Sequence, residues 1–290
     1  MNKKIVFTDL DGTLLNIDKK ISSESERIIK AFTAQGHYLC FVTGRSIEDA
    51  LPYYKQLGLD TVCICNNGAA IHNPSDKEFT DIFFPMNKTV FFKIWNCKEI
   101  QDNTEYFVIK TKRHTFVNKI PTEKKIKERL NTLFHFDFDK IKNKKDTLIY
   151  YRNDRRSDIL SIVLILKPNA NLHTIYYLIK SLTNNLLISH WSIDNRGFDQ
   201  NGQVIIELNH NFANKLNALK FVQSYYDVLW ADTYVFGDGE NDVAMLSKTE
   251  NSWAMKNAST HAISVGRGVT KFDSNHDGVA KTLEELFMPK

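Results

Sequence analysis

The first 85 residues alternate short apolar runs with longer amphipathic segments. Three runs are rich in apolar and β-branched residues and are followed at once by Asp, Gly or Asn, as buried strands often are: residues 4–9, 37–43 and 62–65. Between them, apolar positions recur at helical spacing behind Ser23 and across residues 47–57. Strands that alternate with helices of this length predict a parallel sheet built from βαβ units.

After Pro85 the pattern changes. Residues 106–110 and 114–117 have the pattern of a short hairpin, and residues 159–166 form an almost continuous apolar run that predicts a buried strand. Residues 172–182 predict an amphipathic helix. A hairpin mixed with helices is typical of an α+β domain built on an antiparallel sheet.

The first pattern returns near residue 204. We expect a strand at residues 204–208, a helix at 214–230, a strand at 233–236 and a helix at 241–247. These elements would complete the first sheet. The predicted fold is therefore α/β, with a Rossmann-like parallel-sheet core formed by residues 1–85 and 188–290 and an α+β domain inserted at residues 86–187.

The net charge of +4 is unevenly distributed along the chain. Residues 86–187 contain 20 Lys and Arg against 10 Asp and Glu, whereas the rest of the chain carries a net charge of −6. A basic insert suits a nucleic-acid partner, a solvated surface or the attraction of a small anionic substrate. The basic helix expected at residues 122–134, with Lys124, Lys125, Lys127 and Arg129, is most simply a solvated face, so we expect no nucleic-acid partner.

The sequence offers no sign of export or of a membrane partner. No run approaches the roughly 18 to 20 apolar residues that span a bilayer. The short apolar run near the N-terminus ends in Asp9 and Asp11, and this acidic pair is unsuited to the apolar core of a signal peptide. None of the four cysteines belongs to a Cys-x-x-Cys pair, which suits thiols in a reducing compartment. We expect a cytoplasmic protein, and a monomer is the simplest oligomeric state.

Polar residues gather where four predicted strands end. They are Asp9 to Thr13, Thr43-Gly44-Arg45, Asn66-Asn67-Gly68 and Gly237 to Asp242. Each is compatible with an ordinary turn, but the carboxyl ends of parallel strands meet at one edge of a sheet, where ligands bind. Five carboxylates on one edge would repel one another without a bound cation. Because only oxygen ligands are offered, Mg²⁺ fits better than zinc.

Two further residues point to a phosphate group beside the metal. Thr43 precedes a glycine and the start of a helix, so its hydroxyl and nearby N–H groups can receive anionic oxygens. Lys215, at the start of the helix expected at residues 214–230, can supply the remaining positive charge. A carboxylate-bound Mg²⁺ next to a phosphate site indicates phosphoryl transfer.

The ordered set of motifs resembles the haloacid dehalogenase superfamily. Asp9-Leu10-Asp11-Gly12-Thr13-Leu14-Leu15 looks like its first motif, and Thr43, Lys215 and Gly237-Asp238-Gly239-Glu240-Asn241-Asp242 look like its second, third and fourth. An insert between the second and third motifs resembles the C2 cap, of the C2B type, of the Cof-type hydrolases. Met255-Lys256-Asn257-Ala258 also resembles a segment of that subfamily. One departure is Leu216, where relatives commonly have glycine after the motif lysine.

The resemblance implies a role for each motif residue. Asp9 would be the nucleophile that carries the phosphoryl group, and Asp11 the general acid and base. Mg²⁺ would be held by the Asp9 carboxylate, the Asp11 carbonyl and the Asp238 carboxylate, with Asp242 orienting the water around the metal. Thr43 and Lys215 would neutralise the phosphoryl oxygens.

Other residues near these motifs are expected to contact substrate or its surroundings. They are Gly44, Arg45, Asn67 and Asn241, although Arg45 is equally compatible with a structural salt bridge and Asn67 with a loop cap. The predicted function is a Mg²⁺-dependent phosphatase for small phosphorylated metabolites such as sugar phosphates, nucleotides or phosphorylated cofactors. A phosphomutase and a non-catalytic binding protein for phosphorylated metabolites are the alternatives.

Overall fold

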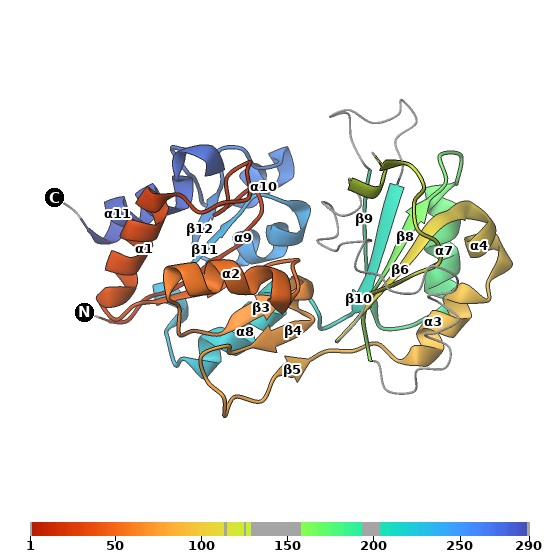
Figure 1. Cartoon of the computed structure of the whole chain (residues 1–290), viewed down its shortest axis with the longest axis horizontal. Helices are drawn as coiled ribbons and strands as arrows, with labels where there is room; N and C mark the ends of the chain where they lie inside the picture. The colour runs from red at the N-terminus through yellow and green to blue at the C-terminus, as the bar shows by residue number, and fades with distance from the viewer. Residues whose placement is uncertain (1, 113–114, 125, 129–157, 193–203, 289–290) are drawn as a thin grey trace. The chain divides into compact units, whose positions relative to one another are not determined.

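The computed structural model describes residues 2–112, 115–124, 126–128, 158–192 and 204–288. The chain forms two compact units, one made of Met1–Ile82 and Asn214–Lys290 and the other of Phe83–Ala213 (Figure 1). The second unit begins close to the boundary expected at residue 86. It continues to Ala213, however, and not only to residue 187.

The first unit is built on a parallel sheet, which confirms the α/β fold class. Its five strands follow the order β13-β12-β11-β1-β2, and each neighbouring pair is parallel. Val42, just beyond β2, makes a parallel bridge to Ile64 in a second, three-stranded sheet of order β3-β4-β5. The strands are β1 (Ile5–Thr8), β2 (Tyr38–Phe41), β3 (Cys63–Cys65), β4 (Ala70–His72), β5 (Ile82–Phe83), β11 (Thr233–Gly237), β12 (Asn251–Ala254) and β13 (Gly268–Val269).

Helices and short 3₁₀ turns connect these strands. Helix α1 begins where the Ser22 side chain accepts the N–H of Ser25, and it lies alongside α11 (Figure 1). The helix expected at residues 214–230 ends at Tyr225, because the backbone turns into the left-handed region at Asp227. The helices are α1 (Ser23–Ala34), α2 (Ile47–Leu57), α8 (Lys215–Tyr225), α9 (Val243–Lys248), α10 (Thr260–Val265) and α11 (Gly278–Phe287), and the turns are η1 (Asn66–Gly68), η3 (Trp230–Asp232), η4 (Glu240–Asp242) and η5 (Ser274–His276).

The second unit is an antiparallel sheet with helices against one face. The strand order is β7-β6-β8-β10-β9. Phe107, Ile162, Leu164 and Ile206 share a buried cluster with residues of α3, α4 and α7. The strands are β6 (Thr104–Thr111), β7 (Thr115–Val117), β8 (Ile159–Leu166), β9 (Leu186–Ser192) and β10 (Val204–His210), and the helices α3 (Lys88–Trp95), α4 (Lys98–Asn103) and α7 (Leu172–Leu182).

One strand lies in a different sheet from the one expected. Residues 204–208, predicted to return to the parallel core, form most of β10, which pairs antiparallel with both β8 and β9. The pairing gives β10 a place in the middle of the second unit's sheet. The core sheet therefore resumes only with β11, after α8. The helix expected at residues 122–134 falls largely outside the described residues, as do Lys125 and Arg129.

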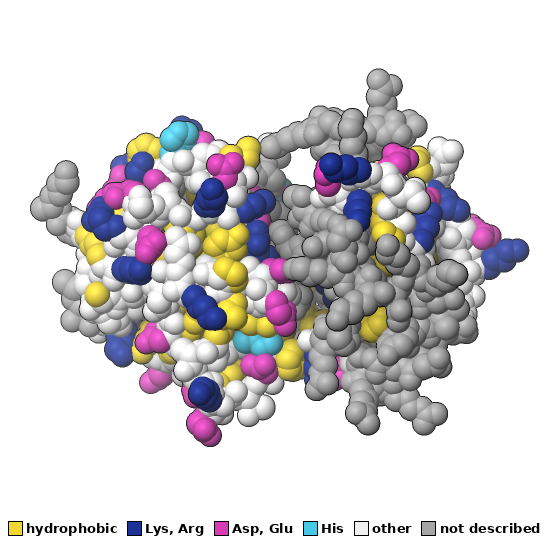
Figure 2. Space-filling view, viewed as in Figure 1, with side chains coloured by type: hydrophobic (Ala, Val, Ile, Leu, Met, Phe, Trp, Pro, Cys, Tyr) yellow, Lys and Arg dark blue, Asp and Glu magenta, His cyan; other side chains and the backbone are white. Residues whose placement is uncertain are grey.

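The surface of the first unit carries both signs of charge. Figure 2 shows Lys and Arg side chains interspersed with Asp and Glu on the visible face of this unit, with apolar side chains between them. Among the described residues, no helix has both the length and the apolar character needed to cross a membrane.

Candidate active site

The register of the parallel sheet brings three of the predicted motifs to one edge. Thr8, the last residue of β1, lies opposite Phe41 of β2 and Phe236 of β11. The N–H of Asp9 donates to the carbonyl oxygen of Phe236 at 3.1 Å. Asp9, Thr43 and Asp238 thus follow neighbouring strand ends, as the sequence predicted for a site at the carboxyl edge.

A buried ammonium group joins the first, third and fourth motifs. Lys215 Nζ lies 3.0 Å from Asp9 Oδ1 and 2.7 Å from Asp242 Oδ1, and its side chain has no exposed surface. Burial alone would lower the pKa of Lys215, but the two carboxylates outweigh that effect and raise it. The residue is therefore held as a cation between two anions. Its place at the first turn of α8 follows from Asn214, whose side chain accepts the N–H of Asn217 and begins the helix.

The second oxygen of Asp242 organises the loop after β11. Asp242 Oδ2 accepts the N–H groups of Asp238 and Gly239, each at 3.0 Å. A Cβ on Gly237 would lie only 2.5 Å from Asp242 Cβ and Cγ, so this carboxylate packs directly on the glycine backbone. With both of its oxygens accepting hydrogen bonds from the protein, Asp242 fits an orienting role better than direct coordination.

Three carboxylates come together at this edge. Oxygen atoms of Asp9, Asp238 and Asp242 lie within 4.8 Å of one another. Burial, only partly offset by Lys215, raises the pKa of Asp9, and burial together with the Asp242 charge raises the pKa of Asp238 to about 7. One ammonium among three carboxylates leaves an excess of negative charge in a buried place. An all-oxygen cluster with that excess fits a hard divalent cation such as Mg²⁺.

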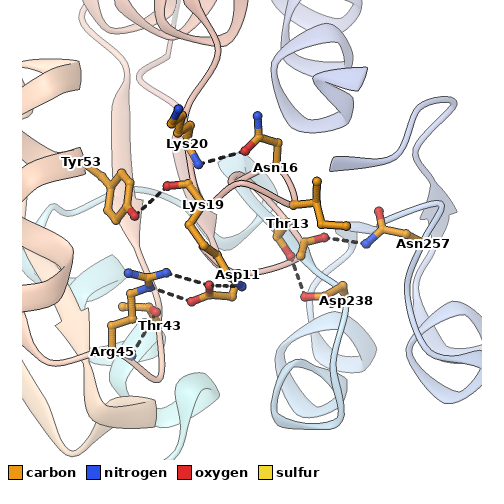
Figure 3. Close-up of polar contacts among 12 residues, drawn as sticks. Asp11, Thr13, Asn16, Lys19, Lys20, Thr43, Arg45, Tyr53, Asp238 and Asn257 are labelled. Carbon is orange, nitrogen blue, oxygen red and sulfur yellow. Dashed lines mark hydrogen bonds and ion pairs between the residues drawn. The ribbon is translucent and has the colours of Figure 1, made fainter. Parts of the chain in front are cut away.

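The loop after β1 packs tightly against Asp238. Thr13 donates from its hydroxyl to Asp238 Oδ1 at 2.9 Å, and Asn257 donates to the Gly12 carbonyl at 2.7 Å (Figure 3). Gly12 has a φ of +74°, and a Cβ there would lie 2.3 Å from Asp238 Oδ2. Thr13 and Asn257 were not among the predicted site residues, although both stand in segments that the resemblance covers.

Asp11 has a different environment from the three clustered carboxylates. Arg45 donates from Nε to Asp11 Oδ2 at 2.7 Å and from Nη2 to Oδ1 at 2.8 Å, and Lys19 Nζ lies 2.7 Å from Oδ1 (Figure 3). Of the two interpretations left open for Arg45, the structure shows a salt bridge. Lys19 was missed, because a lone lysine in a polar loop gives no signal in the sequence.

Thr43, Asn67 and Asn241 lie just after the ends of β2, β3 and β11. The Thr43 side chain is buried, and its Oγ1 accepts the N–H of Arg45 at 3.1 Å. Asn67 Oδ1 accepts from Asn241 Nδ2 at 3.0 Å and would lie 3.1 Å from a Cβ on Gly44. Asn67 is in the left-handed region at a φ of +55°, a strained conformation for a residue other than glycine. The structure thus brings Gly44, Asn67 and Asn241 together.

The chain is similar over nearly its whole length to known phosphatases. The family model for haloacid dehalogenase-like hydrolases matches residues 6–283. The 5-amino-6-(5-phospho-D-ribitylamino)uracil phosphatase YitU of Bacillus subtilis is 26% identical over 290 residues, which is 98% of this chain and 97% of YitU. Phosphatase YwpJ of the same organism is 24% identical and covers 98% of this chain and 99% of its own.

Solved structures show the same fold. A haloacid dehalogenase-like hydrolase from Bacteroides thetaiotaomicron aligns with a TM-score of 0.76 at 18% identity, covering 99% of this chain and 100% of its own. A phosphatase of the superfamily from the same organism gives a TM-score of 0.75 at 21% identity, covering 98% and 95%. Because the family model matches nearly the whole chain and the full-length relatives are phosphatases, the chain belongs to the haloacid dehalogenase-like hydrolase family, as a phosphatase.

Proposed function

We propose that the protein hydrolyses a small phosphorylated metabolite in a Mg²⁺-dependent reaction that passes through an aspartyl-phosphate on Asp9. The observation that carries the proposal is the buried contact of Lys215 with Asp9 and Asp242, beside Asp238. It supplies a nucleophile, a cation for phosphoryl oxygens and a cluster that suits a metal, all at one sheet edge.

In the first half-reaction, an oxygen of Asp9 attacks phosphorus while the bond from phosphorus to the ester oxygen breaks. Lys215 holds Asp9 Oδ1, so we assign the attack to Oδ2. Asp11 gives its proton to the leaving oxygen. In the second half-reaction, Asp11 takes a proton from the water that attacks phosphorus, and the Asp9–phosphorus bond breaks to release inorganic phosphate.

The remaining residues bind and orient. The carboxylates of Asp9 and Asp238 and the carbonyl of Asp11 would hold Mg²⁺, which would neutralise charge on the transferring group. Asp242 would orient these ligands through its hydrogen bonds with Lys215 and with the loop that carries Asp238. Thr43 and Lys215 would receive phosphoryl oxygens. Gly44, Asn67 and Asn241 would line the approach to them, where the Asn67–Asn241 hydrogen bond fixes both amide groups.

We also propose that the second unit, Phe83–Ala213, acts as a cap that selects the leaving group. Every residue assigned to the chemical step lies in the first unit, so the second unit is left for recognition. The relative YitU is named for a phosphorylated ribitylamino-uracil, which supports a small phosphate ester as the substrate class. The four cysteines are free thiols, which supports a cytoplasmic location.

The proposal is tested by measuring phosphate release from a panel of sugar phosphates, nucleotides and phosphorylated cofactors with Mg²⁺. Asp9→Asn should abolish multiple turnover, because the amide cannot serve as the attacking oxygen, whereas Asp18→Asn, an exposed aspartate of the following loop, should leave it unchanged. EDTA should remove activity and Mg²⁺ should restore it, with Ca²⁺ a poor substitute. Multiple turnover in a folded Asp9→Asn protein would refute the covalent mechanism, and an isomerised ester without free phosphate would indicate a mutase.

A further inference from the structure

Asp11 is held by two cationic side chains from different loops. Arg45, just after β2, makes the two hydrogen bonds of a forked contact, one to each carboxylate oxygen. Lys19, from the loop after β1, adds a third donor on Oδ1. A bidentate guanidinium contact fixes the plane of a carboxylate as well as its distance. Because Lys19 contacts only Oδ1, the third donor restricts rotation of the Asp11 carboxylate further.

Tyr53, on α2, contacts both residues that hold Asp11 (Figure 3). Its hydroxyl donates to the carbonyl oxygen of Lys19 at 2.8 Å, and the centroid of its aromatic ring lies 5.1 Å from Arg45 Cζ. Lys19 has a φ of +58°, a strained backbone for lysine that persists only where neighbours impose it. Tyr53 thus fixes the backbone that carries one cation and packs on the other.

Arg45 connects these contacts around Asp11 to Thr43, the residue expected to bind phosphate. The side chain of Arg45 holds Asp11, while its backbone N–H donates to Thr43 Oγ1 at 3.1 Å. Only 10% of the Arg45 side chain is exposed, against 43% for Lys19, so the guanidinium has little freedom to turn elsewhere. A buried guanidinium that lost its carboxylate would carry an uncompensated charge.

We propose that Arg45, Lys19 and Tyr53 form a clamp that sets the direction of the Asp11 carboxylate relative to Thr43 and Asp9. The inference rests on the proposed function, in which Asp11 transfers the protons. Arg45 is then a positioning residue that acts through Asp11, and not a ligand of the substrate phosphate. Lys19 and Tyr53 are positioning residues of the same kind, in a loop and a helix outside the motifs.

The clamp predicts a specific kinetic pattern for Lys19→Met, Tyr53→Phe and Arg45→Lys. Each should lower kcat for an alkyl phosphate by roughly tenfold to a hundredfold, because a misplaced proton-transfer group loses much of its effect. The KM and the inhibition constant of inorganic phosphate should stay within about twofold. The loss with p-nitrophenyl phosphate should be smaller, since its leaving group needs little protonation. Lys20→Met is the matched control, because it removes the adjacent exposed lysine.

The decisive measurement combines each variant with Asp11→Ala, by single-turnover phosphorylation with p-nitrophenyl phosphate. If the residues act through Asp11, adding Lys19→Met or Tyr53→Phe to Asp11→Ala should change the rate by less than about twofold. Additive losses, or a tenfold weaker inhibition by phosphate in Arg45→Lys, would overturn the clamp. Normal kcat in Lys19→Met and Tyr53→Phe would do the same. Undiminished turnover of an alkyl phosphate by Asp11→Ala would instead refute the proton-transfer role in the proposed function.

Discussion

At the scale of single residues, Gly12 shows how closely the first loop is fitted to Asp238. Its φ is positive, and a side chain there would begin with a Cβ only 2.3 Å from Asp238 Oδ2, so any other residue would have to displace that carboxylate. Gly36 has a similar φ of +85°, but a Cβ there would meet nothing within 4 Å. The two glycines therefore separate the cost of backbone conformation from the cost of displacing a carboxylate.

Gly12→Ala should be more damaging than Gly36→Ala. For Gly36→Ala we expect only a backbone cost of about 1 kcal/mol in the free energy of unfolding. For Gly12→Ala we expect a further loss of roughly 1 to 3 kcal/mol from the steric overlap, and Mg²⁺ binding at least about tenfold weaker. Urea denaturation and calorimetric titration with Mg²⁺ measure the two quantities. Equal behaviour of the two variants would show that Asp238 does not depend on this contact.

The pKa of Asp238 predicts how the metal-free protein responds to pH. Because burial and Asp242 raise this pKa from 3.8 to about 7, the folded state keeps a proton that the unfolded state has lost between these values. Folded protein then binds more protons than unfolded protein, so the contribution of Asp238 to stability falls as pH rises from about 4 to about 7.

In EDTA, Asp238→Asn should flatten this part of the stability profile, since the amide does not ionise. In the wild type, Mg²⁺ should add more to the melting temperature at pH 8 than at pH 5, because at low pH the proton competes for the carboxylate. Thermal melts across this pH range measure both effects. A Mg²⁺ stabilisation that is independent of pH would contradict the role of Asp238 as a ligand.

Some contacts between single residues could be predicted from the sequence, and others could not. Asp9, Lys215 and Asp242 could be placed together because each follows a predicted strand or begins a predicted helix, and the fold brings those ends to one edge. The clamp on Asp11 could not be predicted in the same way. It depends on a backbone carbonyl of Lys19 and on the side of α2 that Tyr53 occupies, and neither leaves a pattern in the sequence.

At the scale of elements, the start of α8 positions the buried cation. Asn214 accepts the N–H of Asn217 at 2.9 Å and begins the helix at Lys215. Asn171 does the same for α7 in the second unit, where its side chain accepts the N–H of Thr174 at 3.1 Å. The two asparagines thus make the same capping hydrogen bond, but only Asn214 directly precedes a residue assigned to the proposed reaction.

Both Asn214→Ala and Asn171→Ala should destabilise the protein by about 1 kcal/mol, the usual cost of losing an N-cap. Only Asn214→Ala should also lower kcat, because fraying of the first turn of α8 loosens the Lys215 contacts with Asp9 and Asp242. Urea denaturation and phosphatase assays on the two variants provide the comparison. An unchanged kcat in Asn214→Ala would show that Asp9 and Asp242 hold Lys215 without help from the cap.

The element that the sequence misplaced is β10. Its apolar run identified it correctly as a strand, and the run looks alike whether the strand joins a parallel or an antiparallel sheet. What decides the matter is the pairing with Ser161 to Ile165 of β8 and with β9. Strand β8 lies well before β10 in the sequence, with α7 and β9 between them, so the pattern of β10 alone does not identify this partner.

At the scale of the whole molecule, the chain passes from the first unit to the second after Ile82 and returns before Asn214. Replacing residues 83–213 with a short linker should leave a core that binds Mg²⁺ and hydrolyses p-nitrophenyl phosphate slowly. Its discrimination among natural phosphate esters should collapse, because the proposed cap is gone. Relative kcat/KM values over the substrate panel measure this. A folded core that keeps the parent's order of preference would place specificity in the core loops instead.

The two crossing points have a consequence for how such a protein can change over evolutionary time. A single insertion between Ile82 and Asn214 carries the entire antiparallel sheet of the second unit. The last residue of this insertion, Ala213, directly precedes Asn214, the N-cap of the helix that bears Lys215. Recombination that respects these two junctions can exchange one proposed cap for another and leave the residues of the proposed reaction in place. A junction moved even a few residues into α8 would instead disturb the buried lysine, so the proposed reaction itself limits where such an exchange can be made.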